Sequence, residues 1–241
     1  MNMWNELRAS ARQAAYAATV FLLGGMVAFF CFFAIVLLCL RFVDPPTSAV
    51  MLRDRIAGSN VRHQWTPIEH ISENLIRAVV SSEDARFCRH FGIDFREWRR
   101  ATRDIDRHGI DSVRGASTIT MQVAKNLFLW TERSFARKGL ELAITPIIEL
   151  VWPKRRIMEV YLNIAQWGPG LFGIGVAARR HFKRAAKDLT PREASLLTAS
   201  LPAPSVRKAG DATRFTRRIA ARIRHRMRPG NVQIDCIIRR S

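Results

Sequence analysis

Cysteine is scarce in this sequence of 241 residues. Of its four cysteines, Cys31 and Cys39 lie in a long apolar run, which leaves Cys88 and Cys236 for the rest of the chain. Two cysteines cannot provide a disulfide framework for a domain of this size, so a hydrophobic core must hold it together. We expect two free thiols, with a bridge between Cys88 and Cys236 as the alternative. No spacing of His and Cys indicates a zinc site.

Acidic residues are also scarce. Asp and Glu number 20 against 39 Lys and Arg, and the formal net charge is +19. Residues 1–40 supply only +1 of this charge, from Arg8 and Arg12 against Glu6, so the remaining +18 lies beyond residue 40. Such a surface should bind polyanions, namely anionic lipid headgroups, pyrophosphate-bearing substrates or nucleic acid. Because the sequence also predicts a membrane anchor, anionic lipid is the expected partner and nucleic acid is not.

One long stretch has no charge at all. Residues 13–40 lack any charged side chain, and residues 17–40 are apolar almost throughout. A helix over residues 17–40 is about 36 Å long and can cross a hydrocarbon core of about 30 Å. The run is longer than the apolar region of a signal peptide, and no small-x-small cleavage site follows Leu40. The sequence therefore predicts one uncleaved transmembrane helix over residues 17–40, after a short cytoplasmic N-terminus at residues 1–16.

The flanks of the predicted transmembrane helix do not decide its orientation, because arginines lie on both sides of it. Residues 41–64, which include Pro45-Pro46, predict a juxtamembrane connector. We expect a folded domain over residues 65–206 and a basic C-terminal segment over residues 207–241.

Beyond the connector, the sequence lacks an internal repeat, a low-complexity tract and a convincing series of β-strands, so we expect a mainly α-helical domain. Thr66-Pro67-Ile68-Glu69 has the form of a capping box with proline at the first helical position, which predicts a helix that begins there. That helix should end near Glu83. Thr190-Pro191-Arg192-Glu193 repeats the pattern and predicts a second capped helix through residues 194–201.

Residues 140–151 carry apolar side chains at helical spacing and predict a largely buried helix, with Glu141 at its start and off the buried stripe. Pro146 and Pro153 interrupt this pattern and predict a kink or a break into two helices. A further helix is expected over residues 157–164.

The C-terminal segment, residues 207–241, contains eleven Lys and Arg. Within it, apolar residues fall four apart at Phe215, Ile219, Ile223 and Met227. Three interpretations stay open. The segment could be a terminal helix docked on the domain, an interfacial helix on anionic lipid, or a nucleic-acid-binding element.

Three stretches carry the candidate chemistry. The first is Glu83-Asp84-Ala85-Arg86-Phe87 with His90, Gly92 and Asp94. The second is residues 114–128, which begin Arg114-Gly115-Ala116-Ser117-Thr118. The third runs from Arg137-Lys138 and Glu141 through Tyr161-Leu162-Asn163 to Ala177-Ala178. Together, in this order, they closely resemble the peptidoglycan glycosyltransferases, specifically the monofunctional biosynthetic transglycosylases. The resemblance covers residues 65–204, which is most of the domain.

This resemblance implies a lysozyme-like, mainly α-helical fold. It implies polymerisation of lipid II into β-1,4-linked glycan strands, with release of undecaprenyl pyrophosphate and inversion at the donor anomeric carbon. Glu83 would be the general base for the acceptor hydroxyl. Glu141 would be a second catalytic acidic residue that organises cations or a bound divalent ion. The expected location is the bacterial inner membrane, with the domain on the periplasmic side.

The same resemblance implies a set of substrate-binding residues. The cations that match or lie near the family's positions, and that would stabilise the leaving pyrophosphate, are Lys125, Arg133, Arg137 and Lys138. The residues that would line the donor site are Ser117, Thr118 and Gln122. No cofactor is expected to be required and no protein metal site is expected, with Mg²⁺ or Mn²⁺ as an optional ion.

Met121 departs from the family, which usually has glutamine at this position. Because a thioether cannot donate a hydrogen bond, we expect reduced activity or altered donor affinity rather than inactivity. We expect His90 to be a hydrogen-bonded structural residue, and Tyr161 and Asn163 to serve packing and capping.

Two other classes of function stay open. One is a lysozyme-like lytic enzyme that cleaves glycan strands, because a single acidic residue can also act as general acid; the pyrophosphate-directed cations argue against it. The other is a non-catalytic basic adaptor on a membrane surface. Fewer than 40 residues follow Pro204, too few for a transpeptidase domain, so crosslinking is expected to come from partner proteins of cell-wall synthesis or division.

Overall fold

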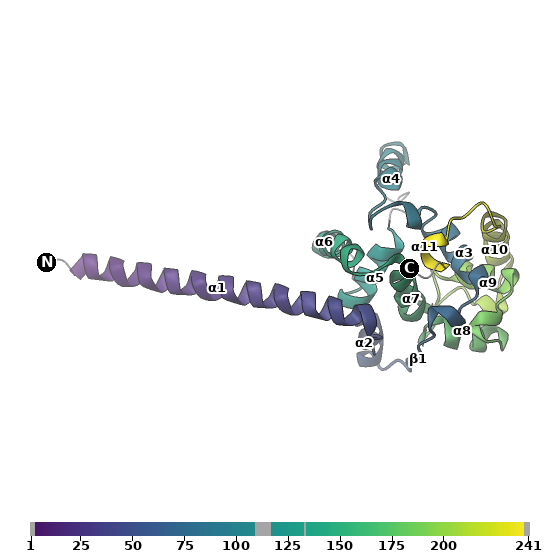
Figure 1. The fold of residues 1–241 in the computed structure, drawn as a ribbon, viewed down its shortest axis with the longest axis horizontal. Coiled ribbons are helices and arrows are strands. Elements are labelled where there is room, and N and C mark those ends of the chain that lie inside the picture. The colour runs from purple at the N-terminus through teal and green to yellow at the C-terminus, as the bar shows by residue number, and fades with distance from the viewer. Residues whose placement is uncertain (1–2, 109–116, 133, 239–241) are drawn as a thin grey trace. The chain divides into compact units, whose positions relative to one another are not determined.

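The computed structural model describes residues 3–108, 117–132 and 134–238. The chain divides into two compact units, Met1–Val43 and Asp44–Ser241 (Figure 1). The first unit is a single helix, α1 (Met3–Phe42). Its stretch Ala15–Phe42 is long and apolar enough to cross a membrane, and it contains the predicted span of residues 17–40. This helix therefore fits a single-pass anchor.

The second unit is built mainly from helices, as predicted. Its α-helices in the described part of the chain are α2 (Ala49–Ile56), α3 (Glu73–Glu83), α4 (Phe95–His108), α5 (Ile119–Phe128), α6 (Phe135–Val151), α7 (Lys154–Ile164), α8 (Ile174–Phe182), α9 (Pro191–Ser200), α10 (Arg214–Arg226) and α11 (Asp235–Ile238). Short 3-10 helices connect several of them, namely η1 (Ile68–His70), η2 (Phe87–Arg89), η4 (Ala186–Asp188) and η5 (Ala209–Asp211).

A small sheet accompanies the helices, although the sequence showed no strand series. It contains β1 (Arg62–His63), β2 (Gln166–Gly168) and β3 (Leu171–Phe172) in the order β1-β3-β2. Strand β1 is parallel to β3, and β2 is antiparallel to it. Strands of two or three residues are too short to show the alternating pattern that predicts a strand.

The helices of the second unit pack in two groups that share one core. Helices α3, α9 and α10 pack against one another, and α5 packs against both α6 and α7. The largest fully buried side chains are Trp152, Trp167, Tyr161, Phe87 and Phe172. The C-terminal end of α3 lies close to α5 and α7, because Glu83 accepts a hydrogen bond from Gln122 and lines a cavity with Tyr161.

The capping box predicted at Thr66 does not start a long helix. Only the 3-10 helix η1 follows it, and α3 begins later, after its own N-cap, Ser72. The backbone N–H of Thr66 donates to Asn163 Oδ1 at 2.7 Å, and that of Ile68 donates to Glu159 Oε1 at 3.0 Å. Side chains of α7 therefore satisfy donors that an N-terminal helix cap would have satisfied.

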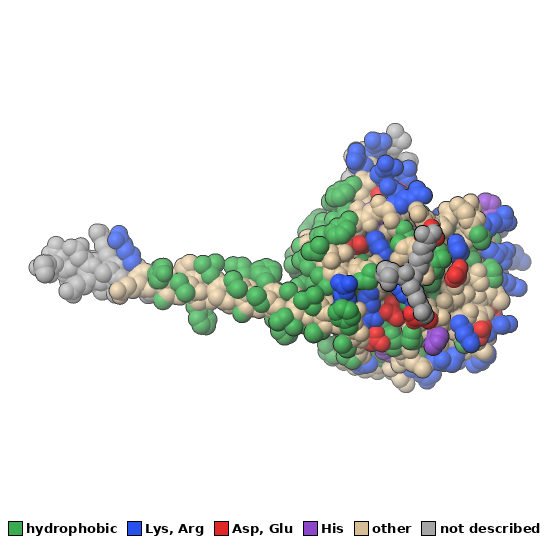
Figure 2. Space-filling model, viewed as in Figure 1, with side chains coloured by type: hydrophobic (Ala, Val, Ile, Leu, Met, Phe, Trp, Pro, Cys, Tyr) green, Lys and Arg blue, Asp and Glu red, His purple; other side chains and the backbone are tan. Residues whose placement is uncertain are grey.

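Helix α6 is buried on its polar face, so the prediction of a buried apolar stripe was wrong. Its buried residues are Arg137, Glu141, Thr145, Ile148 and Glu149. Its exposed apolar side chains include Phe135 (99%), Leu150 (77%), Leu140 (43%) and Ile147 (39%), and Figure 2 shows hydrophobic side chains gathered over this helix. The helix continues through Pro146 and ends before Pro153, so only the second proline breaks it.

The basic C-terminal segment is docked on the domain. Helix α10 packs against α9 and α3, and Ala220, Ile223 and Met227 are buried there. Of the predicted apolar stripe, Phe215 is exposed. Most of the stripe is covered by protein, so this face of α10 is not available to lie on lipid. The structure therefore contradicts the interpretation as an interfacial helix.

Cys88 and Cys236 form a disulfide, so the expectation of two free thiols was wrong. The bridge joins residues 148 positions apart in the sequence, with their Cα atoms 5.7 Å apart. Helix α11 contacts both α7 and η2, and this packing brings Cys236 to Cys88. Sequence spacing alone carries no information about such a long-range approach.

Candidate active site

Glu83 is the last residue of α3, and the apolar face of that helix fixes its place. Leu75, Ile76, Val79 and Val80 are buried in the core, so the helix cannot rotate without exposing them. The helix ends at Asp84, the C-cap residue, whose φ of −161° is extended rather than helical. Glu83 therefore lies at a helix end, as the sequence predicted.

Glu83 lines two cavities. The Ser117 cavity, about 300 Å³ in volume, is lined by Glu83, Ser82, Arg86, Ser117 and Thr118 among others. The Lys125 cavity, about 310 Å³, is lined by Glu83, Arg53, Gln122, Lys125 and Tyr161 among others. One carboxylate can therefore be reached from two sides, which is the arrangement that a base between two reactants requires.

Two side chains fix the carboxylate of Glu83. Gln122 Nε2 on α5 donates to Glu83 Oε2 at 3.3 Å, and Tyr161 Oη on α7 donates to Gln122 Oε1 at 3.3 Å. Burial, together with the negative charges of Glu83 and Asp84, raises the pKa of Tyr161 well above its ordinary value. Tyr161 therefore stays protonated and holds the Gln122 amide with its N–H toward Glu83.

Burial raises the pKa of Glu83, and the neighbouring charge of Asp84 adds to this effect. Hydrogen bonds from Gln122 and Ser82 and the positive charge of Lys125 oppose the rise. A raised pKa makes the carboxylate a stronger base, whereas the donors and the lysine keep a charged fraction available. The surroundings of Glu83 thus suit a general base.

Asp84, which follows Glu83 in the sequence, has a structural role. Its Oδ1 lies 2.8 Å from His90 Nε2, and its Oδ2 accepts from Ile119 N at 3.0 Å. His90 is thus hydrogen-bonded, as predicted. Because Ile119 is the first residue of α5, Asp84 joins the end of α3 to the helix that carries Gln122 and Lys125.

A cationic cluster surrounds the second acidic residue, Glu141. Only 3% of Glu141 is exposed. Lys138 Nζ donates to Glu141 Oε2 at 2.9 Å and to Ser117 Oγ at 3.0 Å. Arg137 pairs with the other carboxylate oxygen of Glu141 and donates from Nε to the Glu132 carbonyl at 2.8 Å.

The cationic cluster and Glu83 belong to one site. Burial lowers the pKa of Lys138, and the charges of Arg137 and Lys125 lower it further. Lys125 also acts on Glu83, and Ser117, which Lys138 binds, lines a cavity with Glu83. Arg137 and Lys125 repel the Lys138 ammonium in addition to the effect of burial, and a bound anion relieves that repulsion.

The remaining predicted residues divide into three cases. Gln122 and Ser117 lie where the prediction put them, at the cavities. The Thr118 hydroxyl lines the Ser117 cavity but donates to the Gly92 carbonyl at 2.5 Å and accepts from Met121 N, so it serves structure. Arg133 lies outside the described residues.

Met121 does not face the site. It is 3% exposed, belongs to the core and lines neither cavity. Neighbouring residues on an α-helix point about 100° apart, so α5 directs Gln122 to Glu83 and Met121 inward. The expectation that methionine removes a donor contact was therefore wrong.

The site residues that were not predicted include Arg53 and Tyr161. Arg53 on α2 lines the Lys125 cavity and binds Thr131 Oγ1 at 2.5 Å, and Tyr161 had been assigned to packing. No local pattern marks either residue. Only the packing of α2 and α7 against α5 brings them to the site.

Glu141 is a poor ligand for a divalent ion in this arrangement. Both of its carboxylate oxygens face a cation, Arg137 or Lys138. The described residues contain no group of three or more His, Cys, Asp or Glu that could hold a metal. The residues present do not fit a resident metal at Glu141, and they fit the role of orienting two cations.

A carboxylate between two cavities, with a cluster of cations beside it, is an arrangement that suits transfer of a group from a donor with an anionic leaving group. The family model described as Transglycosylase matches residues 50–228. The chain therefore belongs to the transglycosylase family, and its mainly helical, lysozyme-like domain agrees with this membership.

Several similar curated relatives are named "Biosynthetic peptidoglycan transglycosylase". The relative from Rhodospirillum centenum is 49% identical over 188 residues, which are 78% of this chain and 80% of the relative. The one from Agrobacterium fabrum is 44% identical over 195 residues, 80% of this chain and 84% of the relative. The one from Brucella suis is 43% identical over 205 residues, 85% and 90% respectively.

Proposed function

We propose that this protein is a peptidoglycan glycosyltransferase that polymerises lipid II into β-1,4-linked glycan strands and releases undecaprenyl pyrophosphate. The observation that carries the proposal is the place of Glu83, which lines two cavities at once. Two sugar chains can meet at this carboxylate, one from each cavity. The family membership and the names of the relatives support the same reaction.

Glu83 acts as general base in this reaction. Its carboxylate takes the proton of the acceptor GlcNAc 4-hydroxyl while that oxygen forms a bond to the donor anomeric carbon. The bond between this carbon and the pyrophosphate oxygen breaks on the opposite side, so the configuration inverts. The pKa raised by burial increases the basicity of Glu83, and Gln122 orients the carboxylate.

Lys125, Arg137 and Lys138 stabilise the leaving pyrophosphate. They are positioned before the reaction, because Glu141 holds Arg137 and Lys138 in place. Such preformed charge stabilises a developing anion without reorganisation. We assign no resident cofactor to the reaction, and a divalent ion that stimulates it would act on the pyrophosphate of the substrate. Activity measured with EDTA and with added Mg²⁺ or Mn²⁺ tests this assignment.

The domain lies on the outer side of the inner membrane. Disulfides such as Cys88–Cys236 persist in oxidising compartments and are rare in the cytosol. The apolar stretch Ala15–Phe42 provides the anchor. The apolar side chains exposed on α6 provide a surface that lipid can cover, where a lipid-linked substrate emerges.

The test is polymerisation of labelled lipid II by the purified full chain in detergent, followed on gels. Glu83→Gln removes the base and should lower the rate at least about 100-fold. Glu73→Gln changes an exposed glutamate at the other end of α3 and should leave the rate unchanged. Full activity of Glu83→Gln would refute the assigned base. Muropeptides released from intact peptidoglycan would favour a lytic enzyme instead.

A further inference from the structure

We propose that the C-terminal segment, residues 231–238, positions the catalytic loop, residues 84–90, through the Cys88–Cys236 disulfide, so that polymerisation depends on an oxidised bridge. This inference rests on the proposed function. It concerns the loop that directly follows Glu83, the general base.

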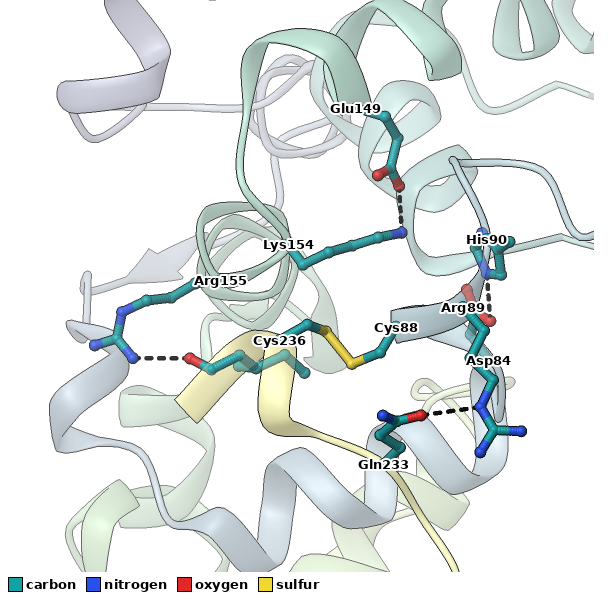
Figure 3. The surroundings of a disulfide bond; sticks show 10 residues. Asp84, Cys88, Arg89, His90, Glu149, Lys154, Arg155, Gln233 and Cys236 are labelled. Atoms are coloured by element: carbon teal, nitrogen blue, oxygen red, sulfur yellow. Dashed lines mark hydrogen bonds and ion pairs between the residues drawn. A yellow bond between two sulfur atoms is a disulfide. The ribbon is translucent and has the colours of Figure 1, made fainter. Parts of the chain in front are cut away.

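Several contacts bind the segment to the loop and its surroundings (Figure 3). The disulfide joins Cys236 on α11 to Cys88 on η2. Arg89 Nε donates to Gln233 Oε1 at 2.9 Å, and Arg155 Nη1 donates to the Ile237 carbonyl at 2.9 Å. The apolar side chains of the segment that are buried are Val232, Ile234 and Ile237. The segment is thus part of the folded domain.

The loop in turn connects to the catalytic residues. Asp84 and His90, at its two ends, bind each other through Oδ1 and Nε2 at 2.8 Å. Asp84 also accepts from the first N–H of α5 at 3.0 Å, and α5 carries Gln122, which binds Glu83. A shift of η2 would therefore move Asp84, the start of α5 and the donor that orients the base.

An ion pair between Lys154 and Glu149 also contacts η2. Lys154 Nζ lies 4.3 Å from the ring centre of Phe87 and 2.7 Å from Glu149 Oε1. Glu149 also accepts from Thr120 Oγ1 on α5 at 2.5 Å. The 3-10 helix η2 is therefore held both by this ion pair and by the disulfide, and loss of the bridge removes one of the two.

The segment lies beyond the part of the chain that the family model covers. That match ends at residue 228, whereas Gln233 and Cys236 come after it. One cysteine of the bridge is thus inside the matched domain and the other outside it. The disulfide therefore joins the matched domain to residues outside the match.

Reduction of the bridge is a balanced two-electron step. A dithiol such as dithiothreitol supplies two electrons and two protons, the sulfur–sulfur bond breaks, and Cys88 and Cys236 become thiols. The dithiol closes to its own disulfide. Oxidised glutathione reverses the change by thiol–disulfide exchange.

The experiment compares oxidised, reduced and reoxidised full-length protein in one detergent, with free thiols counted by mass spectrometry after alkylation. We expect reduction to lower kcat for lipid II about 10-fold, with KM within about 2-fold, because a small misplacement of a catalytic group affects the chemical step most. Reoxidation should restore kcat. Partial unfolding would also lower the apparent kcat at unchanged KM. Circular dichroism therefore measures the folded fraction of the reduced protein, and kcat is calculated per folded molecule.

Cysteine variants distinguish the effect of the Cys88–Cys236 bridge on activity from the effect of the other two cysteines. Cys236→Ser should reproduce the effect of reduction and abolish sensitivity to dithiothreitol. The paired change Cys31→Ser with Cys39→Ser is the matched control, because these cysteines form no disulfide in the described structure, and it should keep both the activity and the sensitivity. If Cys236→Ser does not fold, Gln233→Ala tests the same contact and should lower kcat by a smaller factor.

The outcomes are distinct. Equal kcat for folded oxidised and reduced protein overturns the positioning role, as does an untreated protein in which all four cysteines are alkylated. Oxidised protein that fails to polymerise lipid II contradicts the proposed function itself. Oxidised protein that is active and loses kcat on reduction supports both.

Discussion

Replacement of Glu141 by glutamine tests whether this residue organises cations. The change keeps the shape of the side chain and removes its charge, so Arg137 and Lys138 lose their shared counter-ion. Glu141 is 3% exposed, and the side chain of Arg137 is 11% exposed. Loss of one partner from a buried ion pair costs about 3–5 kcal/mol.

Exposure of Lys138 reduces that cost. Its side chain is 41% exposed, so water can solvate the ammonium, and this half of the cluster contributes no more than a surface pair, about 1 kcal/mol or less. We therefore expect the lower end of the range, a loss of about 3 kcal/mol of unfolding free energy. For a domain of this size, that lowers Tm by about 6–12 °C.

Thermal unfolding of the full chain in detergent, followed by tryptophan fluorescence, measures this loss. Glu73→Gln is the control, because Glu73 is 59% exposed and pairs with Arg77 at 3.3 Å; it should cost less than about 1 kcal/mol. The KM for lipid II should rise in Glu141→Gln, and the acidic limb of the pH–rate profile should stay in place, since Glu83 keeps its neighbours. An unchanged Tm, or a limb that moves, would refute the organising role.

Three further results are expected. Polymerisation should fall as the pH drops through the raised pKa of Glu83, because the base must be charged; Gln122→Leu removes a donor to the charged form and should move this limb of the kcat profile to higher pH. Met121→Gln buries an unpaired amide, so unfolding experiments should show a loss of about 1–3 kcal/mol, and lipid II assays no gain in rate. Leu150→Glu places a charge on the exposed face of α6 and should slow polymerisation in liposomes but not in detergent; equal rates in both would contradict contact between this face and lipid.

Local signals predicted the elements that local interactions determine. The capping box at Thr190 is present, with the side chains of Thr190 and Glu193 each bound to the backbone of the other. Glu83 lies at a helix end, and the two glutamates, Ser117, Gln122 and the cations of α6 meet in one region. Each of these residues lies on a single helix or directly before one: Glu83 ends α3, Ser117 lies just before α5 and Gln122 on it, and the cations lie on α6.

Long-range contacts overrode local signals elsewhere. Thr66 satisfies the same local rule as Thr190, yet Asn163, 97 residues away, binds its backbone N–H. The bridge between Cys88 and Cys236 spans 148 residues, and Tyr161 reaches the site only because α7 packs on α5. Sequence spacing cannot show such contacts, since each depends on how separate helices pack.

Helix α6 shows why periodicity alone could not identify the buried face. The apolar stripe and the polar stripe both repeat at helical spacing, and the usual assumption assigns the apolar one to the core. Here both buried carboxylates of the helix are paired with cations. Glu149 binds Lys154 and Thr120, while Glu141 binds Arg137 and Lys138, so burial of these charges is compensated. In a membrane-tethered enzyme the apolar stripe can face lipid, and the helix then presents its charges to the site where an anionic substrate binds.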